Sequence, residues 1–124
     1  MIFGGVCKRF LRLKIILGHM GETLPYLLWR LDSRYQVKVG QTLAADERPS
    51  AIFRRNFVIT TSGVFDPAPL VAAMATVAED NILFSVDCPY GDSNAAATFI
   101  DNASLSDASR AKICSGNARR VLHL

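Results

Sequence analysis

The sequence predicts an α/β fold built on a parallel sheet, and three observations carry that prediction. Three short apolar runs are rich in β-branched and large side chains and do not alternate cleanly with polar residues: residues 14–18, 57–61 and 82–86. Strands that are covered on both faces have this pattern. A helical pattern follows each run, which favours parallel pairing through right-handed crossovers. The third observation is the length of 124 residues, which fits one domain but is about half of the ~250 residues that a (β/α)8 barrel needs. Three parallel strands alone would leave apolar edges open. The chain is therefore expected to be part of a larger fold.

Helix signals separate the runs. Each signal is an apolar stripe at helical spacing, a residue that can cap a helix N-terminus, or both. They predict helices at residues 24–35, at 67–79 with Asp66 as the cap, and at 94–102. Two short closing helices are expected after Ser106 and Asn117. The basic segment 8–14, with no acidic residue before Glu22, superficially resembles a mitochondrial presequence. We favour the alternative, an amphipathic helix that leads into the first strand. The polar stretch 37–50 predicts a loop insertion, and residues 54–56 are expected in a solvated loop.

Composition excludes several classes of partner. The net charge is only +3 and the basic residues are scattered, so we expect no nucleic-acid partner. No apolar run approaches the ~20 residues of a membrane helix, so we expect no membrane partner either. The three cysteines, Cys7, Cys88 and Cys114, lack the CxxC spacing and are odd in number. We therefore expect a reducing, cytoplasmic location with Cys88 used for packing.

Titratable side chains follow the first and third runs, where parallel α/β folds place their working residues. His19 directly follows the first run and Asp87 the third. A neutral imidazole can serve as a general base or a metal ligand, and a carboxylate can bind a metal or orient that base. Glu22 could fix the tautomer of His19 or stabilise the start of the next helix. The alternative is a structural histidine and an aspartate that caps a helix.

Arg30 lies about three helical turns after His19. If it faces the same opening, its guanidinium could bind a substrate carboxylate through two hydrogen bonds. An ordinary surface ion pair, for instance with Asp32, is an equally good interpretation. The second histidine, His123, is expected at the surface.

Four segments give the chain a family resemblance. LKIILGHMGETLPYLLWRLDSR, FRRNFVITTSGVFDPAPL, ILFSVDCPYGD and NARRVLHL resemble the C-terminal part of the metal-dependent aromatic acid decarboxylases of the amidohydrolase superfamily, such as the gamma-resorcylate, 2,3-dihydroxybenzoate and aminocarboxymuconate semialdehyde decarboxylases. The resemblance runs end to end in motif order. It implies an α/β fold that is the C-terminal portion of a (β/α)8 TIM-type barrel, with the three runs as its last strands.

The resemblance also implies roles for individual residues. His19 would protonate the ring carbon that loses carbon dioxide, and Glu22 would be its hydrogen-bonded partner in a relay. Asp87 would bind a single divalent metal ion, zinc or manganese. Arg30 would hold the substrate carboxylate, with Tyr90 near the aromatic ring. The implied partner is a small aromatic carboxylate, and the full-length relatives are expected to be homo-oligomers.

The chain departs from the family pattern in its metal ligands. Relatives carry a Glu-x-His pair on the first strand and another metal-binding histidine from a middle strand, whereas the only histidines here are His19 and His123. A catalytic site needs about three protein ligands. We therefore expect residues 1–124 to be a partial barrel domain whose N-terminal half is missing, from a truncated or mis-predicted reading frame, inactive in isolation and poorly soluble. The alternatives are a metal-dependent hydrolase of the same superfamily and a non-catalytic truncated protein.

Overall fold

A three-stranded parallel sheet lies at the centre of the structure, a computed structural model that describes residues 1–124. Its strands are β1 (Ile15–Leu17), β2 (Phe57–Thr60) and β3 (Ile82–Leu83), in the order β1-β2-β3. Ile15 pairs with Phe57, and Ile59 pairs with Ile82. All three predicted runs are therefore strands and the pairing is parallel as expected. The third strand is shorter than predicted, because the side chain of Thr61 bonds to Ser85 where the backbone ladder ends.

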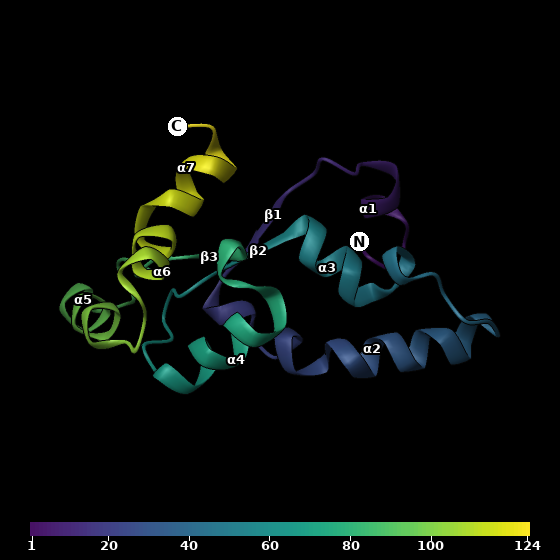
Figure 1. Ribbon diagram of the computed structural model, residues 1–124, viewed down its shortest axis with the longest axis horizontal. Helices are drawn as coiled ribbons and strands as arrows, with labels where there is room; N and C mark the ends of the chain where they lie inside the picture. The colour runs from purple at the N-terminus through teal and green to yellow at the C-terminus, as the bar shows by residue number, and fades with distance from the viewer.

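Helices follow each strand and surround the sheet (Figure 1). Helices α2 (Leu24–Val39) and α3 (Pro49–Asn56) lie between β1 and β2 in the chain, and α4 (Pro67–Val77) lies between β2 and β3. The other helices are α1 (Val6–Arg9) before β1, and α5 (Ser93–Asn102), α6 (Asp107–Ala111) and α7 (Asn117–Leu122) after β3. A π-helical turn, η4 (Lys112–Gly116), joins the last two, and short 3-10 turns occur at η1 (His19–Gly21), η2 (Ala45–Glu47) and η3 (Glu79–Asn81). In Figure 1 the strands lie between α3 on one side and α5–α7 on the other, with α2 and α4 along one edge. None of these helices has the length and apolar character required to cross a bilayer.

The helix ends confirm some of the predicted caps and correct one. Asp66 caps α4 by accepting the Ala68 N–H at 2.9 Å, and Ser106 caps α6. Asn117 does not act as a cap, because the chain runs helically from η4 into α7. Its buried side chain instead donates to the carbonyl oxygens of Glu79 and Ile82, at 2.7 and 2.8 Å.

The predicted loop at 37–50 and the solvated loop at 54–56 are both wrong in part. Helix α2 continues to Val39 and ends at Gly40, whose φ of 68° favours glycine. Residues 49–56 form α3, whose second residue Ser50 is held by Asp32: its N–H donates to Oδ1 at 2.8 Å and its hydroxyl to Oδ2 at 2.6 Å. Asn56 is completely buried rather than solvated. A cap that comes from a helix earlier in the chain leaves no local signal.

The two faces of the sheet have different surroundings. Phe57, Ile59 and Ile82 belong to the hydrophobic core, and Ile15 and Leu17 of β1 pack against it. Phe53 of α3 stacks on Phe57 with the ring centroids 4.8 Å apart. On the opposite face of edge strand β1, by contrast, Ile16 is 47% exposed. The core therefore fixes the strands from the helix side, and the opposite face of β1 is partly exposed to solvent.

Candidate active site at the strand ends

The imidazole of His19 lies between two carboxylates at the carboxyl ends of the strands. Its Nε2 is 3.3 Å from Oδ2 of Asp87, which follows β3, and its Nδ1 is 3.1 Å from Oε1 of Glu22. Parallel strands place these loops at one edge of the sheet, so 68 residues of sequence separate two side chains in contact. The structure thus brings together the three residues to which the sequence assigned proton and metal chemistry.

The two carboxylates favour the charged imidazolium. The hydrogen bond with Asp87 is the main cause that raises the pKa of His19. Desolvation is the next largest effect and opposes it, while the negative charges of Asp87 and Glu22 add to the rise. The side chains of His19, Glu22 and Asp87 are 46%, 64% and 36% exposed, so water screens these interactions. The group is an open proton-carrying site.

Left-handed backbone conformations gather at this site. The φ angles of His19, Met20, Glu22 and Asp87 are 51°, 53°, 55° and 76°, and none of the four is glycine. Each such residue costs roughly 1–2 kcal/mol, so the surrounding structure must hold it in place. Met20 supplies one such restraint, because its side chain is buried in the core. Strain of this kind is typical of functional loops.

The segment that follows β2 contacts the His19 group through residues to which the sequence analysis assigned no role. Ser62 Oγ accepts the backbone N–H of His19 at 3.1 Å, and Thr61 Oγ1 bonds to the backbone of Ser85. Gly63 lies against the pair, because a Cβ there would be 3.1 Å from Cδ2 of His19 and 3.4 Å from Oδ2 of Asp87. The run of small polar residues at a strand end, between two strands that carry titratable groups, is the signal that could have found them.

The side chains of the other predicted site residues form no hydrogen bond or ion pair with the His19 group. Arg30 is exposed on α2, and its suggested partner Asp32 bonds to Ser50 instead. Tyr90 adjoins the group through its backbone, because its N–H donates to Asp87 O at 2.8 Å, but the residue is 90% exposed. Cys88 is exposed, so the expectation that it packs in the interior is wrong, whereas His123 is at the surface as predicted.

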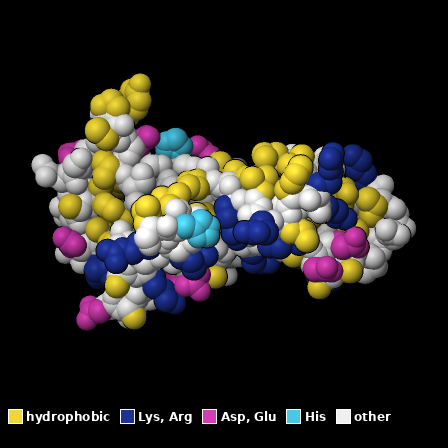
Figure 2. Space-filling view, turned by 90° about the horizontal axis from the view of Figure 1, so that it is seen from above, with side chains coloured by type: hydrophobic (Ala, Val, Ile, Leu, Met, Phe, Trp, Pro, Cys, Tyr) yellow, Lys and Arg dark blue, Asp and Glu magenta, His cyan; other side chains and the backbone are white.

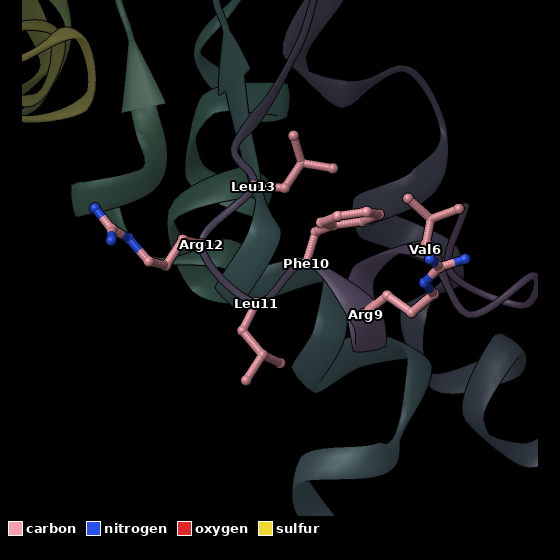
Figure 3. Close-up of a pocket in the computed structure, with 6 residues that line it drawn as sticks. All are labelled: Val6, Arg9, Phe10, Leu11, Arg12 and Leu13. Carbon is pink, nitrogen blue, oxygen red and sulfur yellow. The ribbon is translucent and has the colours of Figure 1, made fainter.

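The largest hollow of the molecule is elsewhere. It has a volume of about 870 Å³ and is lined by residues 6 and 9–13 of the N-terminal segment. The side chains of Leu11 and Leu13 point to opposite sides of the chain there, and Arg12 points away (Figure 3). Binding sites combine an apolar wall with polar groups that converge on one point. This open bend lacks that convergence, so the strand-end group is the better candidate site.

Comparison with known families decides what this arrangement belongs to. The sequence profile of the family described as amidohydrolase matches residues 1–124, the whole chain. The chain belongs to the amidohydrolase family. This confirms the resemblance drawn from the motifs around His19 and Asp87.

Several relatives of this amidohydrolase-family chain are decarboxylases of aromatic acids. It is 41% identical to gamma-resorcylate decarboxylase of Polaromonas sp. strain JS666 over 97% of its own length and 37% of that protein, and 41% identical to that of a Rhizobium species over 100% and 38%. The crystal structure of 5-carboxyvanillate decarboxylase from Sphingomonas paucimobilis matches 100% of the chain and 38% of that protein, with a TM-score of 0.90 and 40% identity. The chain thus spans about two fifths of the length of these relatives, and its α/β fold is that of part of a TIM-type barrel.

A metal ion is present in some solved relatives. A dihydroxybenzoic acid decarboxylase from Polaromonas sp. JS666, 38% identical with a TM-score of 0.86 over 99% of this chain and 37% of that one, was crystallised with manganese and the inhibitor 2-nitroresorcinol. Within the amidohydrolase-family chain described here, no three His, Cys, Asp or Glu side chains are grouped to hold a metal. One carboxylate and a histidine engaged by two carboxylates fall short of the usual three ligands. The residues of this chain do not by themselves form a metal site.

Proposed function

We propose that this chain supplies the proton-donating part of an aromatic acid decarboxylase that acts on a hydroxylated benzoate. The observation that carries the proposal is the imidazole of His19, which lies within 3.3 Å of two separate carboxylates at the open end of a barrel-type sheet. The relatives named above support the choice of reaction, because they are decarboxylases of hydroxylated aromatic acids.

His19 would deliver its proton to the ring carbon that bears the carboxylate. An electron pair of the ring forms the new C–H bond; the bond to the carboxylate then breaks, its electron pair restores the aromatic ring, and carbon dioxide leaves. The proton would leave from Nε2, and Nε2 would take a new proton from solvent after each turnover. Glu22 would accept the N–H of Nδ1, which holds that proton in place and fixes the orientation of the ring. Both carboxylates raise the pKa of His19 and so favour the imidazolium, the form from which this proton would be donated.

The remaining residues complete the proposal. Asp87 would give one carboxylate ligand to a divalent ion such as manganese or zinc, with the other ligands outside these residues. Arg30, exposed on α2, would attract the substrate carboxylate, and Tyr90 would lie beside the aromatic ring. Residues 1–124 would be the C-terminal portion of the barrel, its last three strands. A homo-oligomer and a cytoplasmic location are part of the same proposal.

A hybrid enzyme tests this function. The matching segment of the Rhizobium gamma-resorcylate decarboxylase, 41% identical over 125 residues, is replaced by this chain, and carbon dioxide release from 2,6-dihydroxybenzoate is measured with manganese present. We expect turnover by the hybrid and none by the 124-residue chain alone. His19→Ala should lower kcat about 10²–10⁴-fold, the usual contribution of a general acid.

His123→Ala is the matched control, because it removes the only other histidine from an exposed position with no partner in the site. A hybrid that keeps full activity after His19→Ala would contradict the proposed function. Carbon dioxide release by the chain alone would show that the expectation of inactivity in isolation is wrong.

A further inference from the structure

The end of β2 lies between the two loops that carry His19 and Asp87, and it bonds to both. Ser62 Oγ accepts the N–H of His19 at 3.1 Å, and Thr60 Oγ1 is 2.8 Å from Ser62 Oγ. Both residues are buried, at 9% and 6% exposure for Thr60 and Ser62. A buried hydroxyl needs a partner, so the two hydroxyl groups and the His19 N–H satisfy one another in this small network.

We propose that Ser62 is a positioning residue of the His19 site: its hydroxyl holds the backbone of His19 in the left-handed conformation and thereby sets where the imidazole lies between Asp87 and Glu22. Any effect of Ser62 on catalysis rests on the proposed function, whereas its effect on the position of the imidazole does not. Ser62 acts through the backbone of His19 and does not contact either ring nitrogen in this arrangement.

One hydroxyl group can have this effect because the backbone that it holds is strained. His19 and Met20 follow one another with φ of 51° and 53°, and neither is glycine. Removal of the Ser62 hydroxyl group would leave the N–H of His19 without its partner and would remove a restraint on this strained segment.

The residues on either side of Ser62 contact the segment that carries Asp87, the partner of His19. Thr61 is completely buried, and its Oγ1 donates to Ser85 O at 2.9 Å and accepts from Ser85 N at 3.0 Å, two residues before Asp87. Gly63 leaves the space in which His19 and Asp87 meet. The distance from Nε2 to Oδ2 is thus set from one strand end, with Ser62 on the His19 side.

The test uses the full 124-residue chain, isotope-labelled, with the ring-nitrogen chemical shifts of its two histidines measured at one fixed pH. We expect Ser62→Ala to move the ring-nitrogen chemical shifts of His19 toward those of exposed His123. The same variant should speed the hydrogen exchange of the His19 backbone amide about tenfold or more, since a tenfold change corresponds to a lost hydrogen bond of about 1.4 kcal/mol. Unchanged His19 ring shifts in Ser62→Ala would overturn the proposal.

A second variant and two matched controls keep the test independent of overall folding. Thr60→Val leaves the Ser62 hydroxyl in place but removes its partner, so it should cause a smaller shift of the same sign. Ser115→Ala and Thr76→Val remove hydroxyl groups that bond only to carbonyls of their own helical segments, and both should leave the His19 shifts unchanged. Shifts as large in these controls as in Ser62→Ala would also overturn the proposal.

Kinetics in the hybrid enzyme separate this proposal from the proposed function. Ser62→Ala should lower kcat about 10–100-fold with little change in KM, the pattern of a misplaced catalytic group rather than a lost binding contact. Full kcat in Ser62→Ala together with loss of activity in His19→Ala would refute the positioning role alone. Full activity in His19→Ala would refute the proposed function, while the ring-nitrogen measurement would still decide the geometry.

Discussion

Gly63 shows how the absence of a side chain shapes the site. A Cβ there would approach Cδ2 of His19 to 3.1 Å and Oδ2 of Asp87 to 3.4 Å, and the residue has φ of 66°. Gly40 has nearly the same φ, 68°, but a Cβ there would meet open space. The two glycines therefore separate the cost of the backbone conformation from the cost of crowding the His19–Asp87 pair.

We expect Gly40→Ala to lower the free energy of unfolding by roughly 1–2 kcal/mol, the cost of a left-handed alanine. Gly63→Ala should lower it further, because the new methyl group also pushes His19 and Asp87 apart. Urea denaturation of the two variants measures the difference. Equal losses would show that the space beside Gly63 does not constrain the pair.

Asn56 is a second residue whose effect is larger than its position suggests. Its fully buried Nδ2 donates to Leu13 O at 2.8 Å and lies within 3.4 Å of the carbonyl oxygens of Phe10 and Leu11, so it ties the segment before β1 to the end of α3. We expect Asn56→Ala to cost about 1–3 kcal/mol, because these carbonyls lose their partner. Exposed Asn102, whose side chain bonds only to Thr98 O in its own helix, is the control, and Asn102→Ala should change urea denaturation far less.

At the scale of elements, the start of α3 depends on a contact with α2, the preceding α-helix of the chain. Its N-terminal end is held by Asp32 of α2, through the N–H and the hydroxyl of Ser50. Such a cap contributes typically about 1 kcal/mol. Because the carboxylate of Asp32 bonds to Ser50, it does not form the ion pair with Arg30 that the sequence suggested, and Arg30 is exposed.

We expect Asp32→Ala to lower the melting temperature measured by circular dichroism, by the equivalent of about 1 kcal/mol. Asp46→Ala is a suitable control, since Asp46 lies in exposed η2 and bonds to no other side chain. A melting temperature that is the same in both variants would show that α3 does not depend on this cap.

The elements that sequence could predict are those with local signals. Apolar runs located the three strands, and the rule that parallel strands present their carboxyl ends together predicted that His19 and Asp87 meet. The start of helix α3 and the buried contacts of Asn117 depend on partners far along the chain, so no window of sequence contains their cause. For Thr61 and Ser62, the run of small polar residues at a strand end is a signal, but their partners at Ser85 and His19 are not visible in it. The exposed positions of Arg30 and Cys88 were likewise beyond local pattern, because exposure is decided by packing.

At the scale of the whole molecule, charge is distributed unevenly. In Figure 2, Lys and Arg side chains form one group near the middle of the face and others toward its right end and its lower left, with Asp and Glu between them. Several cations of the chain bond to backbone carbonyls of other elements: Arg54 to Thr76 O, Arg120 to Asp80 O and Lys14 to Arg55 O. Cations near the last turn of a helix offset its dipole, so much of the basic surface has a structural use.

Lys112 links this surface to η3 and predicts a pH dependence of stability. It lies 2.7 Å from Glu79 and 3.1 Å from Asp80. Its hydrogen bond lowers the pKa of Glu79 below the ordinary 4.5, and the Glu79 and Asp80 carboxylates raise the pKa of Lys112 above 10.5. The stabilisation of the fold by the Glu79 carboxylate is present above pH 4.5 and is lost as the pH falls through the lower pKa that Glu79 has in the folded chain. The stabilisation by the Lys112 ammonium group is present below pH 10.5 and is lost as the pH rises through the higher pKa that Lys112 has in the folded chain.

We therefore expect Lys112→Met to lower the melting temperature slightly at neutral pH, by an amount that shrinks in acid below the folded pKa of Glu79 and in added salt. Lys38→Met, at an exposed position of α2 with no ion pair, should have no such pH-dependent effect. A difference between the two variants that persists in strong acid would contradict the assignment.

The open edges of the sheet predict association of the isolated chain. β1 and β3 each have a single strand neighbour, and Ile16 of β1 is 47% exposed. Unpaired apolar edges attract other chains, and a lysine on an edge strand opposes this. We expect sedimentation to show self-association that Ile16→Lys reduces, whereas Val71→Lys, which changes an exposed side chain on α4, should reduce it much less.

The openness of the His19 group has a consequence for how strongly its carboxylates act. At the same two distances, the attraction between an imidazolium and a carboxylate grows severalfold as bulk water gives way to a protein-like dielectric. A surface that covers the imidazole, whether a substrate ring or neighbouring polypeptide, would therefore act in two opposite directions: it strengthens the attraction of both carboxylates, and it removes water that solvates the imidazolium. The degree of cover over His19 thus affects its affinity for a proton as well as its position does.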